Sequence, residues 1–224
     1  MRFFFSDVLN IVRKDLLIEK RTKELFFIML IFALSILFII NFSLNISIKS
    51  NSENSAGIIW LILILSGQLC LNNIMSIEKQ DNVMDAILSA PCKTSAIYLS
   101  KTFSVFLFMF LMSIIIIPMY CIFFNLPFSS LKVLPTAALG SFGYAALGVL
   151  LSSMTVQTRR KDILLPVLFF PLIIPLIVAA VNATQLIFAE NSFTSGNYWI
   201  GQMAAYSLIY FTIGILFFDF IIKN

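Results

Sequence analysis

The largest group of charged side chains that interrupts the long apolar stretches of this 224-residue chain lies between Glu78 and Lys101. Its carboxylates, Glu78, Asp81 and Asp85, are spaced i, i+3, i+7, so a helix would place all three on one face. The apolar face of that helix would consist of Val83, Met84, Ile87 and Leu88. A short amphipathic helix of this kind is suited to noncovalent contact with a partner protein. The alternative is an ordinary solvated loop whose charges keep it out of the lipid.

Two residues end this predicted helix at about residue 90. Pro91 has no backbone donor and disfavours helical geometry in the residue before it, and Ser89 lies just upstream. The predicted helix therefore covers about residues 78–90 and lies between two apolar stretches.

The sequence contains no recognisable set of catalytic or metal-binding residues. It has no His, which removes the commonest general base and the commonest metal and haem ligand. The three cysteines, Cys70, Cys92 and Cys121, are too scattered for a disulfide framework or a thiolate metal site. No GxxxxGKS or GxxxxGKT loop is present, so any ATP-driven work would need a nucleotide-binding partner. We predict a protein that is not an enzyme and has no catalytic, cofactor-binding or metal site of its own.

The elements that would position the amphipathic segment are membrane spans. Hydrophobic residues make up 60% of the chain and charged residues 12%, and the mean hydropathy is +0.98, unlike an ordinary soluble domain. Several long uncharged stretches each hold the ~20 apolar residues that cross a bilayer. They predict a single all-α integral membrane domain, residues 1–224, with six spans at about 25–41, 56–75, 97–124, 135–156, 163–181 and 200–222.

The basic residues predict the orientation of these spans. With the N-terminus in the cytoplasm, every Lys and Arg except Lys49 and Lys132 falls on the cytoplasmic side, as the positive-inside rule requires. Both termini are therefore expected in the cytoplasm. Residues 3–23 predict a basic amphipathic helix that lies in the membrane interface, and the alternative is a basic flank that only fixes the topology. The apolar face of this helix consists of Phe5, Val8, Leu9, Val12 and Leu16.

Polar and small residues inside the spans predict close contacts between helices. Gln68, Asn72 and Asn73 make the inner half of the second span polar, and we favour a role in joining helices over lining a path for a ligand. The fourth span has small residues at helical spacing, which would let a neighbouring helix approach closely. These residues are Ala137, Ser141, Ala145, Gly148 and Ser152, with Gly140 and Gly143 beside them.

A charged loop and a proline-rich span follow the fourth span. The loop would anchor the cytoplasmic end of the protein and offer charge to a partner or to anionic headgroups. It consists of Arg159, Arg160, Lys161 and Asp162. Pro166, Pro171 and Pro175 deprive the fifth span of backbone donors, so it must bend or break, and neighbours or water must satisfy the freed carbonyls. A static kink and a moving part are both compatible with this pattern.

Taken together, an interfacial N-terminal helix, about six spans and a short cytoplasmic helix after the second span resemble the ABC-2 type permease subunits. The residues that carry this resemblance are Glu78, Asp81, Asp85, Ile87, Leu88, Ser89, Pro91, Tyr98 and Lys101. In that family the cytoplasmic segment is the coupling helix that docks on the ATPase. The resemblance therefore implies an ATPase-coupling interface at these residues, apart from Tyr98. The carboxylates would make polar contacts, and Ile87 and Leu88 would fill a groove on the ATPase.

A more specific resemblance is carried by four segments that occur in this order along the chain. They are Gly57–Trp60, Asp85–Lys101, Gly140–Gly148 and Arg159–Pro175. In this combination they are similar to the CcmB family, haem exporter protein B of cytochrome c maturation. The resemblance implies a permease subunit, present in two copies, that assembles with a separate ATPase, CcmA, and with the haem-handling proteins CcmC, CcmD and CcmE. It also implies that ATP hydrolysis drives release of the haem-loaded chaperone CcmE from CcmC and CcmD.

The composition limits how this chain itself could handle haem. Because His is absent, axial ligands could come only from Met, Tyr or Cys, so we predict mechanical coupling without haem ligation. Haem would then be cargo of the complex, and ATP would be bound by the partner subunit. The alternatives are an ABC-2 permease that exports another amphiphile, such as a lipid or drug, and a structural assembly subunit that does not move. The expected location is the bacterial inner membrane, with the mitochondrial inner membrane as the alternative.

Overall fold

The computed structural model describes residues 2–43, 52–80, 94–124, 132–155, 161–190 and 196–223. Within these ranges it contains helices and no β-strand, which confirms the predicted all-α class. The helices are α1 (Arg2–Thr22), α2 (Glu24–Ser43), α3 (Ser52–Gln80), α5 (Thr94–Phe123), α6 (Leu134–Thr155), α7 (Lys161–Glu190) and α8 (Asn197–Lys223). All of them except α1 are long and apolar enough to cross a membrane, so the predicted integral membrane protein with six spans is confirmed as well.

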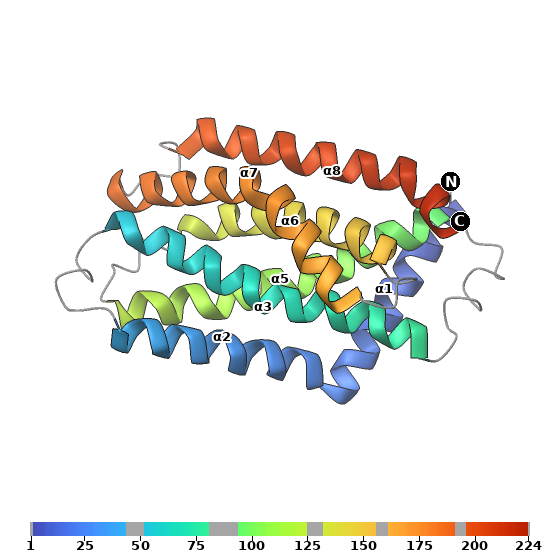
Figure 1. The fold of residues 1–224 in the computed structure, drawn as a ribbon, viewed down its shortest axis with the longest axis horizontal. Helices are drawn as coiled ribbons and strands as arrows, with labels where there is room; N and C mark the ends of the chain where they lie inside the picture. The colour runs from blue at the N-terminus through green and yellow to red at the C-terminus, as the bar shows by residue number, and fades with distance from the viewer. Residues whose placement is uncertain are drawn as a thin grey trace.

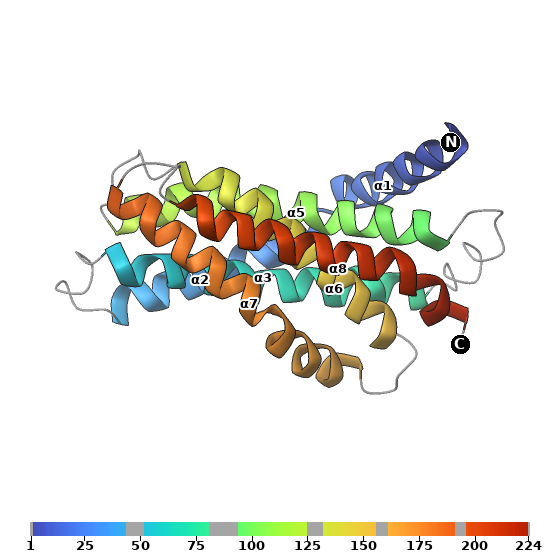
Figure 2. The ribbon, with the colours of Figure 1, turned by 90° about the horizontal axis from the view of Figure 1, so that it is seen from above.

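The long helices lie side by side and alternate in direction, while α1 runs obliquely beside one end of the bundle (Figure 1, Figure 2). Because the number of spans is even, both chain termini lie at that end, which we call the N/C end (Figure 1). The last turns of α3 and α6 and the first turns of α5 and α7 point to the N/C end too. The helices that flank the predicted coupling segment and the charged loop therefore meet at the end that carries α1.

Helix α6 is central in the bundle, since it packs against α3, α5, α7 and α8. Its small residues allow these neighbours to come close, as the sequence predicted. Ala137, Ser141 and Ala145 are buried, and a Cβ added to Gly140 would overlap the indole ring of Trp60 on α3. Small residues at helix contacts are the usual way in which membrane helices pack tightly without a hydrophobic driving force between them.

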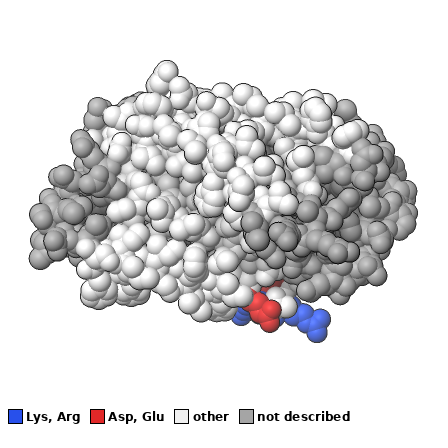
Figure 3. All heavy atoms as spheres, viewed as in Figure 1, with Lys and Arg blue, Asp and Glu red and all other residues white. Residues whose placement is uncertain are grey.

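The outer surface of the bundle is apolar over most of its length. Exposed apolar side chains on α2, α7 and α8, such as Ile39, Val167 and Leu216, are in the position to contact lipid chains. Among the side chains that the structure describes, every charged one except Lys101 and Lys132 belongs to residues 13–24. Figure 3 accordingly shows charge gathered at one edge of a face that is otherwise free of described charges.

Two helices extend beyond the spans predicted for them. The fifth span was predicted to end at residue 181, but α7 continues to Glu190. The polar residues beyond the predicted end bond within their own helix: Asn182 donates to the Val178 carbonyl at 2.7 Å, and Thr184 Oγ1 donates to the Ala180 carbonyl at 2.8 Å. The second span was predicted to end at residue 75, close to the end of the apolar stretch at Asn73, and α3 continues as a helix to Gln80. Residues 78–80 of the predicted coupling helix therefore continue α3, and residues 81–90 lie outside the described ranges.

The proline-rich helix α7 bends without breaking. It is helical through Pro166, Pro171 and Pro175, and its first turns diverge from the neighbouring helices in Figure 2. The Tyr210 hydroxyl on α8 donates to the Leu172 carbonyl at 2.6 Å. The neighbouring carbonyl of Pro171 would accept from the N–H of residue 175 in a regular helix, but Pro175 has no N–H to donate. A side chain of a neighbouring helix thus supplies a hydrogen bond in the turn that the prolines disrupt, as expected for a helix in lipid.

Candidate functional site

Lys101 on α5 is almost completely buried, with 2% of its surface exposed. Its ammonium Nζ lies 2.9 Å from Oδ2 of Asp15 on α1, and the Ser104 hydroxyl donates to the same oxygen at 3.2 Å. Lys101 and Ser104 share a face of α5 because they are three residues apart on a helix. The Asp15 side chain is only 12% exposed, so both charges of the pair are withdrawn from water. We call these three residues the α1–α5 junction.

The α1–α5 junction fixes how α1 lies on the bundle. A charge in a low-dielectric environment is costly unless it is paired and hydrogen-bonded, and this pair meets both conditions. Apolar contacts flank it, since Val12 is buried and Leu16 packs against the core. The predicted interfacial helix is therefore attached to the protein through the face that contains Val12, Asp15 and Leu16. Leu9, which the sequence placed on the same apolar face, is exposed.

Tyr98 lies one turn before Lys101 on α5 and joins three helices. Its hydroxyl donates to the Ala146 carbonyl on α6 at 2.9 Å, and its ring packs against Phe218 on α8 with the centroids 5.3 Å apart. The close approach of α8 depends on Gly214, because a Cβ there would overlap the phenol carbon and oxygen of Tyr98. The first turns of α5 are therefore tied to α6 and α8 through Tyr98 and to α1 through Lys101.

The structure describes part of the predicted coupling interface. Lys101 lies at the α1–α5 junction, and Glu78 lies in the last turn of α3. In the charged loop, Lys161 and Asp162 open α7. The other predicted site residues of these two segments lie outside the described ranges, and they are Asp81, Asp85, Ile87, Leu88, Ser89, Pro91, Arg159 and Arg160.

Sequence reasoning missed three residues of the site: Asp15, Ser104 and Gly214. The available signal for Asp15 was its position between Val12 and Leu16, where a carboxylate interrupts the apolar face of a basic helix. Ser104 is one turn after Lys101 on α5, but a lone Ser in an apolar span is common. The sequence gives no signal for Gly214, because the need for glycine there comes from the ring of Tyr98, which is far away along the chain.

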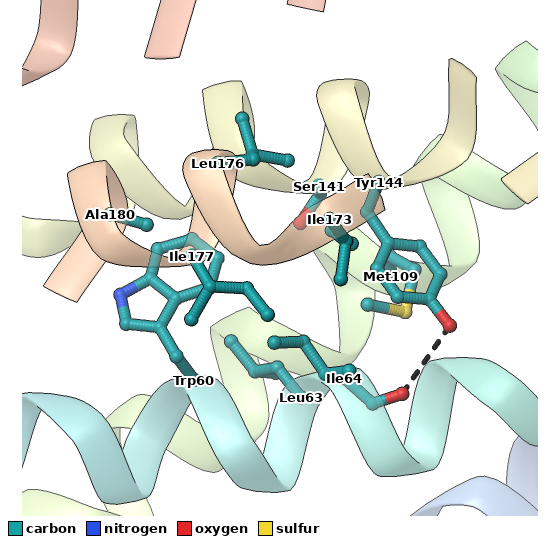
Figure 4. Close-up of a pocket in the computed structure, with 11 residues that line it drawn as sticks. Trp60, Leu63, Ile64, Met109, Ser141, Tyr144, Ile173, Leu176, Ile177 and Ala180 are labelled. Carbon is teal, nitrogen blue, oxygen red and sulfur yellow. Dashed lines mark hydrogen bonds between the residues drawn. The ribbon is translucent and has the colours of Figure 1, made fainter. Parts of the chain in front are cut away.

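A small apolar cavity lies among the described helices α3, α5, α6 and α7 and is drawn in Figure 4. Its volume of about 10 Å³ is close to the space that a single water needs and far below the ~300 Å³ at which ligand pockets begin. Tyr144 donates to the Ile64 carbonyl at 3.3 Å at one side of this cavity, and Trp60 donates to Thr184 at 3.0 Å at the other. A cavity of this size has no room for haem.

Two further features bear on whether the bundle holds a ligand. In the described ranges, no three His, Cys, Asp or Glu side chains come together as they would around a metal ion. Gln68 on α3 is 9% exposed, and its amide makes no hydrogen bond to any described residue. The predicted role of Gln68 in joining helices therefore stays a prediction.

The family model described as CcmB protein matches residues 6–216, which is nearly the whole chain. The chain belongs to the CcmB family. Two relatives of this CcmB chain carry the name heme exporter protein B. The protein of Rhodobacter capsulatus is 24% identical over 169 residues, which cover 75% of this chain and 78% of the relative. The protein of Paracoccus denitrificans is 24% identical over 173 residues, which cover 77% of this chain and 79% of the relative.

Most of the candidate site lies within the part of the chain that the CcmB model covers. The match begins before Asp15 and ends after Gly214, so it includes the α1–α5 junction, Tyr98 and Gly214, while Phe218 lies just beyond its end. The buried ion pair and Tyr98 are therefore part of the matched CcmB region.

Proposed function

We propose that this CcmB chain is the transmembrane permease subunit of an ABC transporter complex for cytochrome c biogenesis. A separate ATPase, CcmA, would supply the energy of ATP hydrolysis, since the sequence has no phosphate-binding loop of its own. Support comes from the CcmB match over residues 6–216 and from two bacterial relatives named heme exporter protein B. On this proposal the chain is a multi-pass protein of the bacterial inner membrane, with its basic N/C end in the cytoplasm.

The observation that carries the coupling mechanism is the buried Lys101–Asp15 pair so soon after the predicted coupling helix. The segment that follows α3 leads directly into α5. Any displacement that the ATPase imposes on this segment moves the first turns of α5, which Lys101 ties to α1 and Tyr98 ties to α6 and α8. A local push at the N/C end would then be transmitted to much of the bundle as movement of packed helices.

The ATPase would dock at two neighbouring places on the N/C end. In the first, Glu78, Asp81 and Asp85 make polar contacts while Ile87 and Leu88 fill an apolar groove. In the second, the charged loop of residues 159–162 contacts the ATPase or anionic headgroups. Two copies of the permease would allow each ATPase copy to engage one of them.

We assign the haem chemistry to the partner proteins. The absence of His and the small core cavity both argue against haem bound within this subunit. The proposed role is mechanical: ATP-driven movement of CcmB would release the haem-loaded chaperone CcmE from CcmC and CcmD. Haem would be cargo of the complex, and CcmB would provide the moving membrane part.

Leu88→Asp tests this proposal at the predicted docking face. Burying a carboxylate in an apolar groove is strongly unfavourable, so we expect the variant to insert normally but to lose most ATP hydrolysis coupled to the complex. The measurement is purification from the native membrane, identification of the associated chains by mass, and assay of ATP hydrolysis. Asn82→Asp is the matched control, because it adds the same charge in the same segment without removing an apolar side chain.

The result has distinct consequences for each part of the proposal. Unchanged coupled hydrolysis in Leu88→Asp would remove Leu88 from the docking face. Association with an unrelated export ATPase, without haem-handling proteins, would instead support a permease for another amphiphile. Association with the maturation proteins but no ATP-dependent change in the contacts between helices would support a purely structural subunit.

A further inference from the structure

The elbow between α1 and α2 is a fixed turn built around a single residue, Lys23. Its backbone is left-handed, with φ of 57°. The Lys23 N–H donates to the Glu19 carbonyl at 2.6 Å, and the Lys23 carbonyl accepts from Phe27 N–H at 3.2 Å. The Glu19 carboxylate also accepts from the N–H of Phe26 at 2.8 Å, which satisfies a first-turn donor of α2. These bonds hold the interfacial helix and the first span at a set angle.

A cleft of about 390 Å³ lies beside this elbow, between α1, the start of α2 and α5. Most of its wall is apolar, and the apolar residues are Leu16, Phe26, Phe27, Phe108 and Leu111. The polar part of its wall consists of Glu19, Lys20 and Lys23. Phe27 and Leu111 are about half exposed, so the apolar wall is continuous with the lipid-facing surface of the bundle. The cleft therefore has a charged end and an apolar end.

We propose that this cleft binds one anionic phospholipid. The phosphate would lie between the ammonium groups of Lys20 and Lys23, and an acyl chain would lie along Phe27, Phe108 and Leu111. The elbow joins a helix of the interface to a span, so the cleft lies at the depth where lipid headgroups meet acyl chains. Lys20 and Lys23 are both exposed at the charged end, in the place where basic side chains attract anionic lipid.

Charge selects an anionic lipid over a zwitterionic one. The Glu19 carboxylate is engaged by a backbone donor of α2, and the two lysines outnumber it at the cleft. A headgroup with a net negative charge, such as phosphatidylglycerol, gains from this excess, whereas the positive group of phosphatidylcholine opposes it. Free phosphate shares the headgroup chemistry but lacks the acyl chain that the apolar wall would bind. This proposal does not depend on coupling to an ATPase.

The test is native mass spectrometry of the purified full-length chain titrated with phosphatidylglycerol or with phosphatidylcholine of the same acyl chains. We expect the first phosphatidylglycerol to bind more tightly than phosphatidylcholine. In the double variant Lys20→Gln/Lys23→Asn the affinity for phosphatidylglycerol should fall roughly 30-fold, because each basic residue contributes ~1 kcal/mol near an anionic surface. Asn is chosen at position 23 because it tolerates the left-handed conformation better than most residues.

Three controls distinguish lipid binding in this cleft from general attraction between basic side chains and anionic lipid. Arg13→Gln/Arg21→Gln removes two charges from the same helix but outside the cleft, and it should keep the preference for phosphatidylglycerol. Leu111→Trp narrows the apolar end and should weaken the first binding step for both lipids. Inorganic phosphate should not displace the bound lipid. The proposal would be overturned if both double variants lost the same affinity for phosphatidylglycerol, or if Lys20→Gln/Lys23→Asn bound it as tightly as the wild type.

Discussion

At the scale of single residues, the position of Asp15 explains why a charged residue is tolerated on the packed face of α1. Its carboxylate accepts from Lys101 at 2.9 Å and from Ser104 at 3.2 Å, so the charge is compensated where water is excluded. Lys14 is the contrasting neighbour, because its ammonium lies 4.0 Å from the other carboxylate oxygen and its side chain is 43% exposed. Removing one partner of a buried ion pair lowers the free energy of unfolding far more than removing one partner of an exposed pair.

Asp15→Ala should therefore destabilise the protein far more than Lys14→Met. Removing one partner of a buried pair costs about 3 kcal/mol or more, whereas an exposed pair contributes about 0.5 kcal/mol. Asp15→Ala/Lys101→Met should recover much of the loss, because it leaves no buried charge. The measurement is the free energy of unfolding in mixed detergent micelles for the wild type and the three variants. A double variant as unstable as Asp15→Ala would show that the ion pair is not the source of the effect.

At the scale of elements, the first turns of α5 connect α1 with α6 and α8 at the N/C end. Its third turn holds α1 through Lys101, and the turn before holds α6 through the Tyr98 hydroxyl. The contact between α5 and α8 is different in kind, because it depends on the absence of a side chain at Gly214. Close packing of this sort responds to a single added methyl group.

Gly214→Ala should loosen the contact of α8 with Tyr98. The added methyl group overlaps an aromatic ring that is fully buried, so we expect a loss of about 1–3 kcal/mol in the free energy of unfolding. Gly201→Ala is the matched control on the same helix, since its Cβ would meet no atom within 4 Å. That control should be neutral or stabilising, because Ala is the better helix former. Equal stability of the two variants would contradict the packing argument.

The sequence predicts the elements of this molecule better than it predicts their contacts. A bilayer requires long uncharged stretches, so hydropathy alone reveals the six spanning helices α2, α3, α5, α6, α7 and α8. Helix α7 continues past the end predicted for the fifth span, and polar residues such as Asn182 bond within the helix there. The Lys101–Asp15 pair joins residues 86 positions apart, and no local periodicity reports such a contact. Lys101 was singled out from the sequence, but its partner was not.

At the scale of the whole molecule, the packed core of the bundle is distinct from the N/C end, where α1 and both termini lie. The termini, α1 and the helix ends that flank the predicted docking segments all lie at the N/C end (Figure 1). The cavity found between the described parts of α3, α5, α6 and α7 has a volume of only about 10 Å³. The proposed coupling would use this division, with the ATPase acting at the N/C end and the packed helices shifting against one another.

The same division predicts that the isolated subunit does not ligate haem. Met109 and Tyr144 line the cavity and are the side chains there with atoms that could serve as axial ligands. Purified full-length protein mixed with haem should give only weak absorption changes, well below one haem per chain, that are the same in Met109→Leu and Tyr144→Phe. Met112→Leu removes a buried thioether that does not line this cavity and serves as the control. A haem spectrum at one equivalent per chain that is lost in Met109→Leu or Tyr144→Phe, but kept in Met112→Leu, would place haem inside the bundle. The mechanical proposal would then have to give way to a path for haem through the helices.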